Sequence, residues 1–301
     1  AVTQAAAFAS SPYQGRTIAL ATLHGKERVI GRSLRHGLGA SLLHLSAIDT
    51  DQQGSFCGAV ARRGTALEAC VAKAQLALEQ GGTGLAIASE GSFGPHPAVP
   101  LLAVGSECMV FLDAQRGLTI HEELLARRTN HSHHRLAVTG GGAPEDDPAL
   151  ERWLKQVGFP SHGLLVRPLA SNGPTSCVIK DIQDPAALYR AIQQAAADSD
   201  AGLLQLETDM RAHRNPTRMA SIRQLAFRLV RRIATPCPRC GSPGWGRVGS
   251  EAGLPCGWCG LPTALTRVEL LACPGCGHQA PQPRRDGLLH ADPQHCQHCN
   301  P

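Results

Sequence analysis

The sequence predicts an α/β fold in which helices flank a mixed sheet, followed by a small cysteine-rich module. Two observations predict it. Short apolar runs typical of strands alternate with segments of helical periodicity up to residue 234, which is the order of helices layered on a sheet. After "RLVRRIAT" the composition changes to cysteine, glycine and proline. We therefore expect an α/β domain over residues 16–234 and a separate module over residues 235–301.

The bulk composition restricts the class of protein. The chain has 301 residues, of which 43% are hydrophobic and only 4% aromatic, so we expect one large aliphatic core. No apolar run approaches the roughly 20 residues that a membrane span needs. The first ten residues lack the basic start and the apolar stretch of a secretion signal. These features favour a cytoplasmic protein that binds no membrane, with a disordered end over residues 1–15.

The individual elements follow from the spacing of the apolar residues. Apolar runs predict strands at 17–22, 41–46, 84–89, 107–113, 163–169, 177–182 and 202–208. Helical spacing, rich in alanine and leucine, predicts helices at 26–37, 64–80, 147–157, 184–197 and 216–232. Glycine and proline predict a loop over "EGSFGPHPAVP" (90–100) and a linker over 138–148. The histidines of "TNHSHHR" (His131, His133 and His134) favour a polar surface turn over a metal site.

Four cysteine pairs in the tail are the strongest motif. Each pair has two intervening residues, so one tight turn can aim both sulfur atoms at a metal, and two turns complete a tetrahedral site. The ligands would be Cys237, Cys240, Cys256, Cys259, Cys273, Cys276, Cys296 and Cys299. The gaps of 15 residues between the first two pairs and 19 between the last two fit zinc ribbons. We expect two structural zinc ions in a double ribbon, since all four positions of each ion would be filled.

The assignment of pairs to ions stays open. Consecutive pairing, first with second and third with fourth, is favoured, and the crossed arrangement is the alternative. Disulfides and redox-active pairs are disfavoured because the chain shows no export signal and the spacing is regular. His278, His295 and His298 would become ligands only if a cysteine did not coordinate. Two such sites of net charge −2 each lower the formal charge of +5 to about +1, which weakens the charge-based case for nucleic acid.

Charged side chains gather where the strand at 202–208 ends. Glu207 and Asp209 lie at its carboxyl end, the usual edge for sites in α/β sheets. Asn215 followed by Pro216 is a typical helix start. The loop between them and the first turn of the helix carry four candidate phosphate ligands: Arg211, His213, Arg214 and Arg218. Arg214 and Arg218, four residues apart, would face the same side. The alternative is that these charges pair among themselves on the surface.

Two further clusters follow predicted strands. In "ATLHGKERVI", Gly25 permits a tight turn, and a phosphate would lie at the helix start near His24, Lys26 and Arg28. Glu27 could hold a divalent ion instead. In "ASEGSFGPHP", Glu90 follows a buried strand directly, and Ser92 and His96 are candidate substrate contacts. The alternative for Glu90 is a simple loop carboxylate. The Walker spacing of glycine and Lys-Ser/Thr is absent.

The motifs "LATLHGKERVI", "GTALEACVAKAQLAL" and "GLAIASEGSFG" resemble the inosine triphosphate pyrophosphatase superfamily over residues 16–95. The resemblance implies a nucleotide pyrophosphatase-like fold, with Lys26 as the phosphate-binding lysine and Glu90 as the metal carboxylate. Glu68 and Lys73 match that superfamily's helix motif, and "RMASIRQLAFRLV" is loosely similar to its final helix. A single Glu90 replaces the paired aspartates of the superfamily, and His24 stands near its usual asparagine. The whole chain also resembles an uncharacterised bacterial domain family of unknown function with terminal cysteine pairs.

Together these features predict a Mg²⁺- or Mn²⁺-dependent hydrolase acting on a phosphoanhydride of a nucleotide or related phosphate. Glu27, Glu90, Glu207 and Asp209 would hold the ion or activate water, and the basic residues would bind phosphate. The alternative is a protein without catalysis that binds a nucleotide, or nucleic acid through its zinc ribbons. The enzyme hypothesis requires that acids and guanidinium groups distant in sequence meet in one cleft. Neither hypothesis fixes the oligomeric state.

Overall fold

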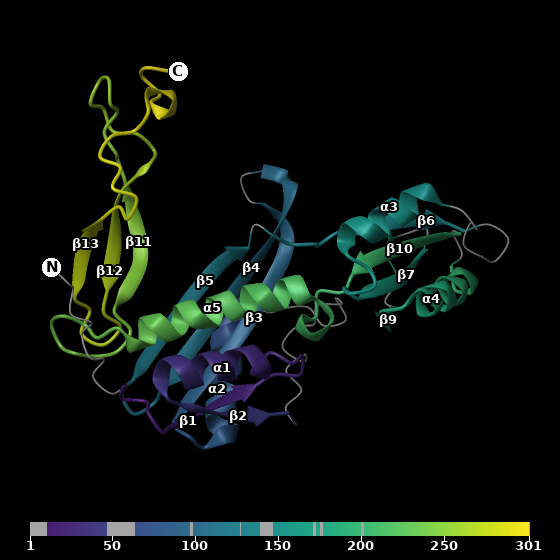
Figure 1. Cartoon of the computed structure of the whole chain (residues 1–301), viewed down its shortest axis with the longest axis horizontal. Coiled ribbons are helices and arrows are strands. Elements are labelled where there is room, and N and C mark those ends of the chain that lie inside the picture. Colours follow the sequence, from purple (N-terminus) through teal and green to yellow (C-terminus); the bar gives the residue numbers. More distant parts are fainter. Residues whose placement is uncertain are drawn as a thin grey trace, which may run out of the picture. The chain divides into compact units, whose positions relative to one another are not determined.

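The computed structural model describes residues 11–46, 64–96, 99–126, 128–138, 147–170, 173–174, 177–199 and 202–300. The chain divides into two compact units. Unit 1 comprises Ala1–Asp113 and His121–Leu229, and unit 2 comprises Ala114–Ile120 and Val230–Pro301 (Figure 1). The boundary expected near Ala234 therefore lies a few residues inside unit 2. No helix in the described ranges has the length and hydropathy to cross a bilayer.

The start of the described chain differs from the expected disordered end. Residues 1–10 lie outside the described residues, but residues 11–15 form a turn rather than a disordered segment. Tyr13 in this turn is fully buried. Its hydroxyl donates a hydrogen bond of 3.0 Å to Asp113 Oδ2, and its ring meets Phe111 edge-on. Tyr13 therefore anchors the turn to the sheet. The alanine-rich sequence before it gives no indication of this contact.

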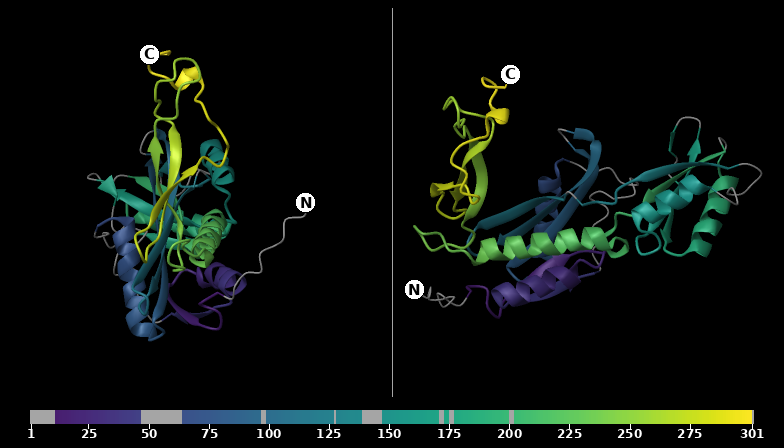
Figure 2. Two further views of the ribbon diagram at one scale, coloured as in Figure 1. Left: turned by 90° about the vertical axis from the view of Figure 1, so that its left-hand side faces the viewer. Right: turned by 45° about the horizontal axis from the view of Figure 1, so that its top comes forward.

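The first sheet of unit 1 is mixed, as predicted. Its order is β2 (Ser41–Leu45), β1 (Thr17–Ala21), β3 (Leu85–His96), β4 (Val99–Asp113) and β5 (Leu118–Ala126). Strand β1 is parallel to β2 and β3, and β3 is antiparallel to β4. Helices α1 (Glu27–Leu38) and α2 (Ala66–Gly81) connect the parallel strands and lie on opposite faces of the sheet (Figure 2), as two right-handed crossovers in opposite directions require.

Local sequence explains how the two helices begin, end and pack. Helix α1 places Ile30, Leu34 and Leu38 on its buried face and ends at a left-handed glycine. Helix α2 begins with a capping box between Thr65 and Glu68. It packs on β1 and β3 through small residues, with Ala77 against alanines of both strands. Small side chains bring the helix close to the sheet and so fix the height of its polar residues above the strands.

Strands β3 and β4 form a hairpin longer than predicted. The expected loop at 90–100 is wrong, because the structure continues β3 to His96 and begins β4 at Val99. Glu90 pairs with Cys108, and Gly91 pairs with Glu107, inside the ladder. Glycine and proline are depleted in strands, and here they occupy a two-stranded extension with a register shift at Pro95/His96. Glu90 therefore projects from mid-strand and not from a loop.

Unit 1 contains a second sheet that the sequence did not separate from the first. Its order is β6 (His133–Ala137), β10 (Leu203–Thr208), β7 (Leu164–Ala170) and β8 (Gly173–Pro174), and β9 (Ile179–Ile182) also pairs with β7. All these pairings are antiparallel. The turn expected for His133 and His134 is thus an edge strand. The alternating apolar pattern of β10 identifies a strand but carries no information about which sheet it joins.

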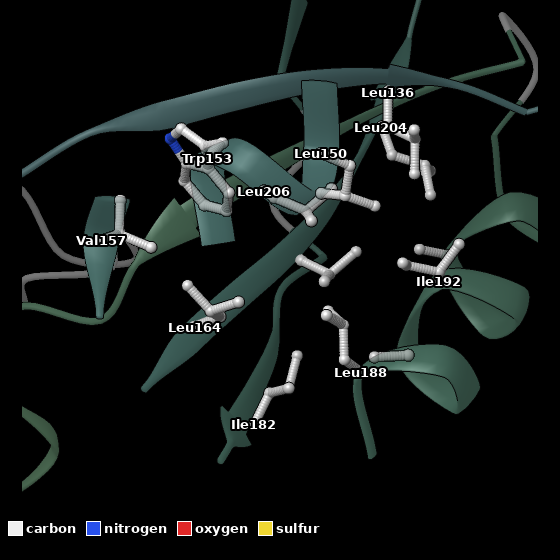
Figure 3. Packing of buried hydrophobic residues seen from close by; sticks show 13 residues of the cluster. Leu136, Leu150, Trp153, Val157, Leu164, Ile182, Leu188, Ile192, Leu204 and Leu206 are labelled. Carbon is white, nitrogen blue, oxygen red and sulfur yellow. The ribbon is translucent and has the colours of Figure 1, made fainter. Parts of the chain in front are cut away.

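Two helices cover one face of the second sheet. Helices α3 (Pro148–Val157) and α4 (Pro185–Ala197) each begin at an aspartate cap followed by proline. Their apolar residues meet the inward side chains of β6, β7, β9 and β10 in one core (Figure 3). Its labelled members are Leu136, Leu150, Trp153, Val157, Leu164, Ile182, Leu188, Ile192, Leu204 and Leu206. The opposite face of β10 carries Gln205 and Glu207, so this sheet is apolar on one side and polar on the other.

The last helix and unit 2 complete the fold. A short helix, η2 (Ala212–Arg214), leads into α5 (Pro216–Ala234). The predicted cap is confirmed, because Asn215 Oδ1 accepts a hydrogen bond of 2.9 Å from the backbone amide of Arg218. In unit 2, β11 (Gly246–Ala252), β12 (Thr266–Ala272) and β13 (Gln279–Pro283) form an antiparallel sheet, and a short helix, η3 (Pro293–His295), precedes the final cysteine pair.

Candidate functional site

The eight tail cysteines form two groups of four in unit 2. One group joins the first and third pairs and the other joins the second and fourth. The members are Cys237, Cys240, Cys273 and Cys276, then Cys256, Cys259, Cys296 and Cys299. The favoured consecutive pairing is therefore wrong and the crossed arrangement is right. The physical reason is that β11 and β12 are antiparallel neighbours, so the turns before β11 and after β12 lie at the same end of the ribbon.

The geometry of both groups fits zinc. All sulfur atoms of a group lie within 4.8 Å of one another. The sulfur of Cys237 is 3.9 Å from that of Cys276, and the sulfur of Cys240 is 3.6 Å from that of Cys273. The second group repeats these two distances. A tetrahedron with Zn–S bonds of about 2.3 Å has edges of about 3.8 Å, so the cysteines are already spaced for the ion.

Three of the four cysteine turns direct a backbone amide at a sulfur atom. The amides of Arg239, Trp258 and Gly275 donate to the sulfur two residues earlier at 3.3–3.4 Å. Gly241, Gly260 and Gly277 follow the first three pairs with φ of about 70°, a conformation that glycine adopts without steric cost. Asn300 occupies the corresponding place after the fourth pair. The alternative ligands His278, His295 and His298 belong to neither group, which leaves four thiolates per ion and a structural role.

A second polar cluster is buried in unit 1. Lys73 of α2 lies 2.6 Å from Glu90 Oε2 on β3. Arg218 of α5 lies 2.7 Å from Glu107 Oε1 on β4. All four side chains are at least nine-tenths buried. Glu107 stands opposite Gly91, the neighbour of Glu90, in the ladder, so the two carboxylates project to opposite faces of the sheet. Each is paired there with a cation from the helix on its own face, as the cost of burying a charge requires.

Arg218 joins this cluster to the loop after β10. Its Nη1 donates to the backbone oxygen of Met210, and its guanidinium lies 5.0 Å from the centre of the Phe93 ring. Gly91 leaves the room that the ion pair occupies. A Cβ atom there would be 2.5 Å from Arg218 Nη2 and 2.7 Å from Glu107 Oε2. Gly91 is thus required because the Arg218–Glu107 ion pair lies too close to this strand for a side chain.

Lys26 lies at the edge of the cluster with few partners. It is 5% exposed, and its Nζ donates one hydrogen bond of 2.8 Å to the backbone oxygen of Ser89. Burial and the charge of Arg218 lower the pKa of Lys26 to about 8, against the opposing effects of Glu90 and Glu107. Nearby, Ser89 Oγ and Glu27 Oε2 are buried without a hydrogen-bond partner among the described residues. An ammonium group and a hydroxyl with spare hydrogen-bonding capacity are suited to an anion.

Two histidines stack beside Lys26. The rings of His24 and His213 are 5.3 Å apart and nearly parallel. Burial, followed by the charges of Lys26, His213, Arg218 and Arg211, lowers the pKa of His24 to about 3. His24 is therefore neutral at physiological pH. The turn of "LHGKE" and the loop of "MRAHRN" consequently meet, although about 190 residues of sequence separate them.

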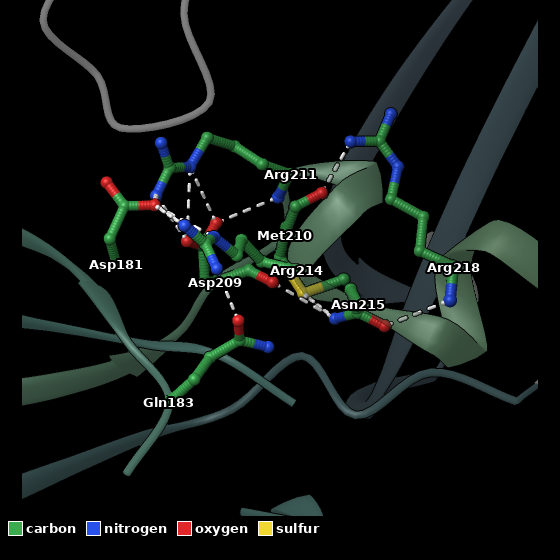
Figure 4. Close-up of polar contacts among 8 residues, drawn as sticks. All are labelled: Asp181, Gln183, Asp209, Met210, Arg211, Arg214, Asn215 and Arg218. Atoms are coloured by element: carbon green, nitrogen blue, oxygen red, sulfur yellow. Dashed lines mark hydrogen bonds and ion pairs between the residues drawn. The ribbon is translucent and has the colours of Figure 1, made fainter. Parts of the chain in front are cut away.

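The remaining charges of the 209–214 loop pair with one another. Arg211 makes a forked contact with both oxygens of Asp209, with its Nη2 at 2.7 Å from Oδ2 (Figure 4). Arg211 and Arg214 also contact Asp181 of β9, at 3.0 and 2.7 Å. The alternative that these charges pair among themselves is therefore confirmed for Asp209, Arg211 and Arg214. The expectation that Arg214 and Arg218 share a side is wrong, because Figure 4 shows their guanidinium groups on opposite sides of the loop.

Other predicted residues lie apart from the cluster. Glu207 contacts Arg167 and Gln205 on the polar face of the second sheet. There it lines a cavity of about 190 Å³ together with His131, His133, Asp209 and Arg211. Arg28 and Ser92 are exposed. The side chain of His96 lies outside the described part. Among the described residues only the two cysteine groups assemble three or more metal-type ligands, so no carboxylate site for Mg²⁺ or Mn²⁺ is formed by these residues alone.

Sequence reasoning missed three residues of the site. Glu107 looked like the start of a strand, and Asp181 looked like part of an ordinary strand. Phe93 lay within the expected loop. A signal for Glu107 existed, because a carboxylate opening an otherwise apolar run, "ECMVFLD", is expensive to bury unless a cation meets it. No local signal identifies Arg218 as that cation.

Comparisons with known proteins assign a family. No curated protein and no solved structure matches the chain. The likeness to the inosine triphosphate pyrophosphatase superfamily thus rests on the sequence motifs alone. One family model matches residues 73–301, which include Lys73, Glu90, Glu107, Arg218 and both cysteine groups. Because this match spans well over half of the chain, the protein belongs to the family described as Domain of unknown function (DUF6671).

Proposed function

We propose that unit 1 binds the phosphate groups of a nucleotide or related phosphate and hydrolyses a phosphoanhydride bond in it. The observation that carries the proposal is Lys26, a buried ammonium group at the start of α1. Among the described residues its one hydrogen-bond acceptor is the Ser89 carbonyl, and the neighbouring Ser89 Oγ has no partner there. Backbone amides at a helix start favour anions. The motif resemblance of residues 16–95 supports the same ligand class.

The roles of the residues follow from their contacts. Lys26 would donate to a phosphoryl oxygen, and the first amides of α1 would donate to the same group. Arg218 is engaged by Glu107 and by the Met210 carbonyl, so it would act by holding these two groups in place. Glu90, oriented by Lys73, would accept the proton of the attacking water as the new P–O bond forms and the leaving phosphate departs. Neutral His24 would act by stacking on His213 and so positioning the loop that carries it.

A divalent ion is the cofactor that the superfamily resemblance implies. Such an ion would neutralise charge on the phosphate groups. The described carboxylates do not fit a complete protein site for it, because no three of them come together. We therefore assign no step to the ion, and its requirement is a variable of the experiment.

The direct test is a screen of nucleoside triphosphates for release of phosphate or pyrophosphate, with and without Mg²⁺ or Mn²⁺. Three variants would be compared with the wild type: Lys26→Met, Glu90→Gln and the control Lys155→Met, an exposed lysine of α3. We expect the first two to lower the rate by about 100-fold, the usual effect of removing one group that stabilises a transition state. Full activity in Lys26→Met and Glu90→Gln would overturn the proposal.

A second candidate function is nucleic-acid binding by unit 2. One observation favours it: Trp258, in the knuckle of the second cysteine group, is 79% exposed and could stack on a base. The arginines of the sheet weaken the case, because Arg247, Arg267 and Arg285 pair with Glu251 or Glu269. Binding of single-stranded RNA or DNA that falls with salt and with Trp258→Ala would support this candidate.

A further inference from the structure

Arg211 and Arg214 converge on a single carboxylate oxygen. Arg211 Nη2 lies 3.0 Å from Asp181 Oδ1, and Arg214 Nη2 lies 2.7 Å from the same oxygen. Each guanidinium also has a second partner, and in Arg211 the Nη2 group contacts both Asp181 and Asp209. Asp209 forks onto Arg211, and Gln183 Oε1 accepts from Arg214 Nη1 (Figure 4). Two preoriented guanidinium groups that share one acceptor resemble the arrangement by which arginines bind phosphate.

The backbone of Asp181 has an unusual conformation. Its φ is +65°, and no other described residue except glycine has a positive φ. Val166 pairs with Ile179 and Leu164 pairs with Ile182, so two residues of β9 stand opposite one residue of β7. Asp181 is the second residue of this bulge. Bulges redirect side chains, and a non-glycine residue in the left-handed region is held in a strained backbone conformation.

The Asp181 side chain is more exposed to solvent than the side chains of the two arginines. The side chain of Asp181 is 48% exposed, whereas those of Arg211 and Arg214 are 18% and 30% exposed. The carboxylate therefore covers the arginines from the solvent side. A phosphoryl group offers several oxygens to the two guanidinium groups, where Asp181 offers one. An anion from solution can reach the pair once Asp181 moves aside.

This arginine pair neighbours the site proposed around Lys26. Asp209, which holds Arg211, follows β10 directly, and His213 stands between the two arginines in the chain and stacks on His24. Gly163 fixes the loop, because its amide donates to the Arg214 carbonyl and its carbonyl accepts from the Asp209 amide, both at 2.8 Å. A ligand with two linked phosphate groups is suited to such adjacent anion-binding places.

We propose that Arg211 and Arg214 form a second anion subsite, for another phosphoryl group of the same substrate, and that the Asp181 carboxylate occupies it when no ligand is bound. Asp181 is then an internal competitor that lowers the apparent affinity by the fraction of molecules in which it covers the arginines. This inference deepens the proposed function and rests on it for the choice of ligand.

Calorimetric titration with inorganic pyrophosphate tests the subsite. Asp181→Asn keeps the size of the side chain and a residue type that tolerates positive φ, but removes its charge. We expect it to bind pyrophosphate about 10-fold more tightly than the wild type, and Arg214→Gln to bind it more weakly. Asp198→Asn is the matched control, because it removes one exposed carboxylate from the same unit and should leave the affinity unchanged.

The outcomes separate this inference from the proposed function. Equal or weaker binding by a folded Asp181→Asn protein would overturn the competitor role. If that variant unfolds, Asp181→Gly, which relieves the backbone strain, takes its place under the same expectation. Unchanged affinity in Lys26→Met, together with tighter binding in Asp181→Asn, would reject the proposed site and retain the arginine subsite. The reverse pattern would retain the proposed site and reject the competitor.

Discussion

Lys26 is a buried ammonium group whose charge depends on conditions close to neutrality. Its pKa is lowered to about 8 by burial and by Arg218, with Glu90 and Glu107 opposing and Lys73 adding to the effect. In the unfolded chain the pKa is near 10.5. Between these values the unfolded state binds more protons, so the contribution of Lys26 to folding stability rises with pH from about 8 to 10.5.

Ligand binding should show the opposite trend. A bound phosphate stabilises the charged form of Lys26, so affinity for inorganic phosphate is expected to fall as pH rises above about 8, by up to about tenfold per unit. Titrations from about pH 7.5 to 10 would measure it. The Lys26→Arg variant keeps its charge throughout this range and should give a flat profile. A wild-type profile as flat as that of the variant would exclude Lys26 as a ligand.

The close packing of the Arg218–Glu107 ion pair against Gly91 can be tested by substitution. Gly91→Ala would place a methyl group 2.5 Å from Arg218 Nη2 and 2.7 Å from Glu107 Oε2. We expect it to lower the free energy of unfolding by about 1–3 kcal/mol, the usual cost of overpacking a buried site. Gly94→Ala is the control in the same strand, because no atom of the described residues lies within 4 Å of its Cβ position. Similar stability of both variants in urea would contradict the close packing of the ion pair.

Among the elements, the helices and the first strands were predictable, and the long hairpin was not. The capping residues Thr65, Asp147, Asp184 and Asn215 each appear in the sequence where a helix starts, and such local signals can be read directly. The extension of β3 through "GSFGPH" depends instead on pairing with β4, a non-local interaction that overrides the low strand propensity of glycine and proline. Glu90 was therefore found, but its strand position was misjudged.

The crossed arrangement of the cysteine pairs predicts how many zinc ions each double variant binds. Purified wild-type protein should contain two zinc ions per chain. Cys237→Ser/Cys273→Ser removes two ligands of one group, so one ion should remain, whereas Cys237→Ser/Cys256→Ser damages both groups and should leave none. Atomic absorption measures the difference. Consecutive pairing would reverse the two results, with no zinc in the first double variant and one ion in the second.

For the molecule as a whole, the sequence predicts the kind of chemistry at the candidate site better than it predicts which residues form the site. Lys26, Glu90 and Arg218 are predicted from strand ends and helix starts, and the structure buries all three. Glu90 and Arg218 lie on opposite faces of the first sheet, and both lie close enough to Lys26 to shift its pKa. Glu207 is predicted to join them because it lies close to Asp209 in sequence, but it projects from the polar face of the second sheet, where it contacts Arg167 of the neighbouring strand β7. Partners such as Glu107 and Arg218 lie 111 residues apart, and no local pattern specifies such a contact.

The central claim is that a phosphate group binds at the Lys26 end of this cluster. A crystal structure of the full chain with pyrophosphate tests it most directly. We predict density for a phosphoryl group within hydrogen-bond distance of Lys26 Nζ and Ser89 Oγ, at the first turn of α1. Pyrophosphate bound elsewhere, with Lys26 still donating only to the Ser89 carbonyl, would contradict the account.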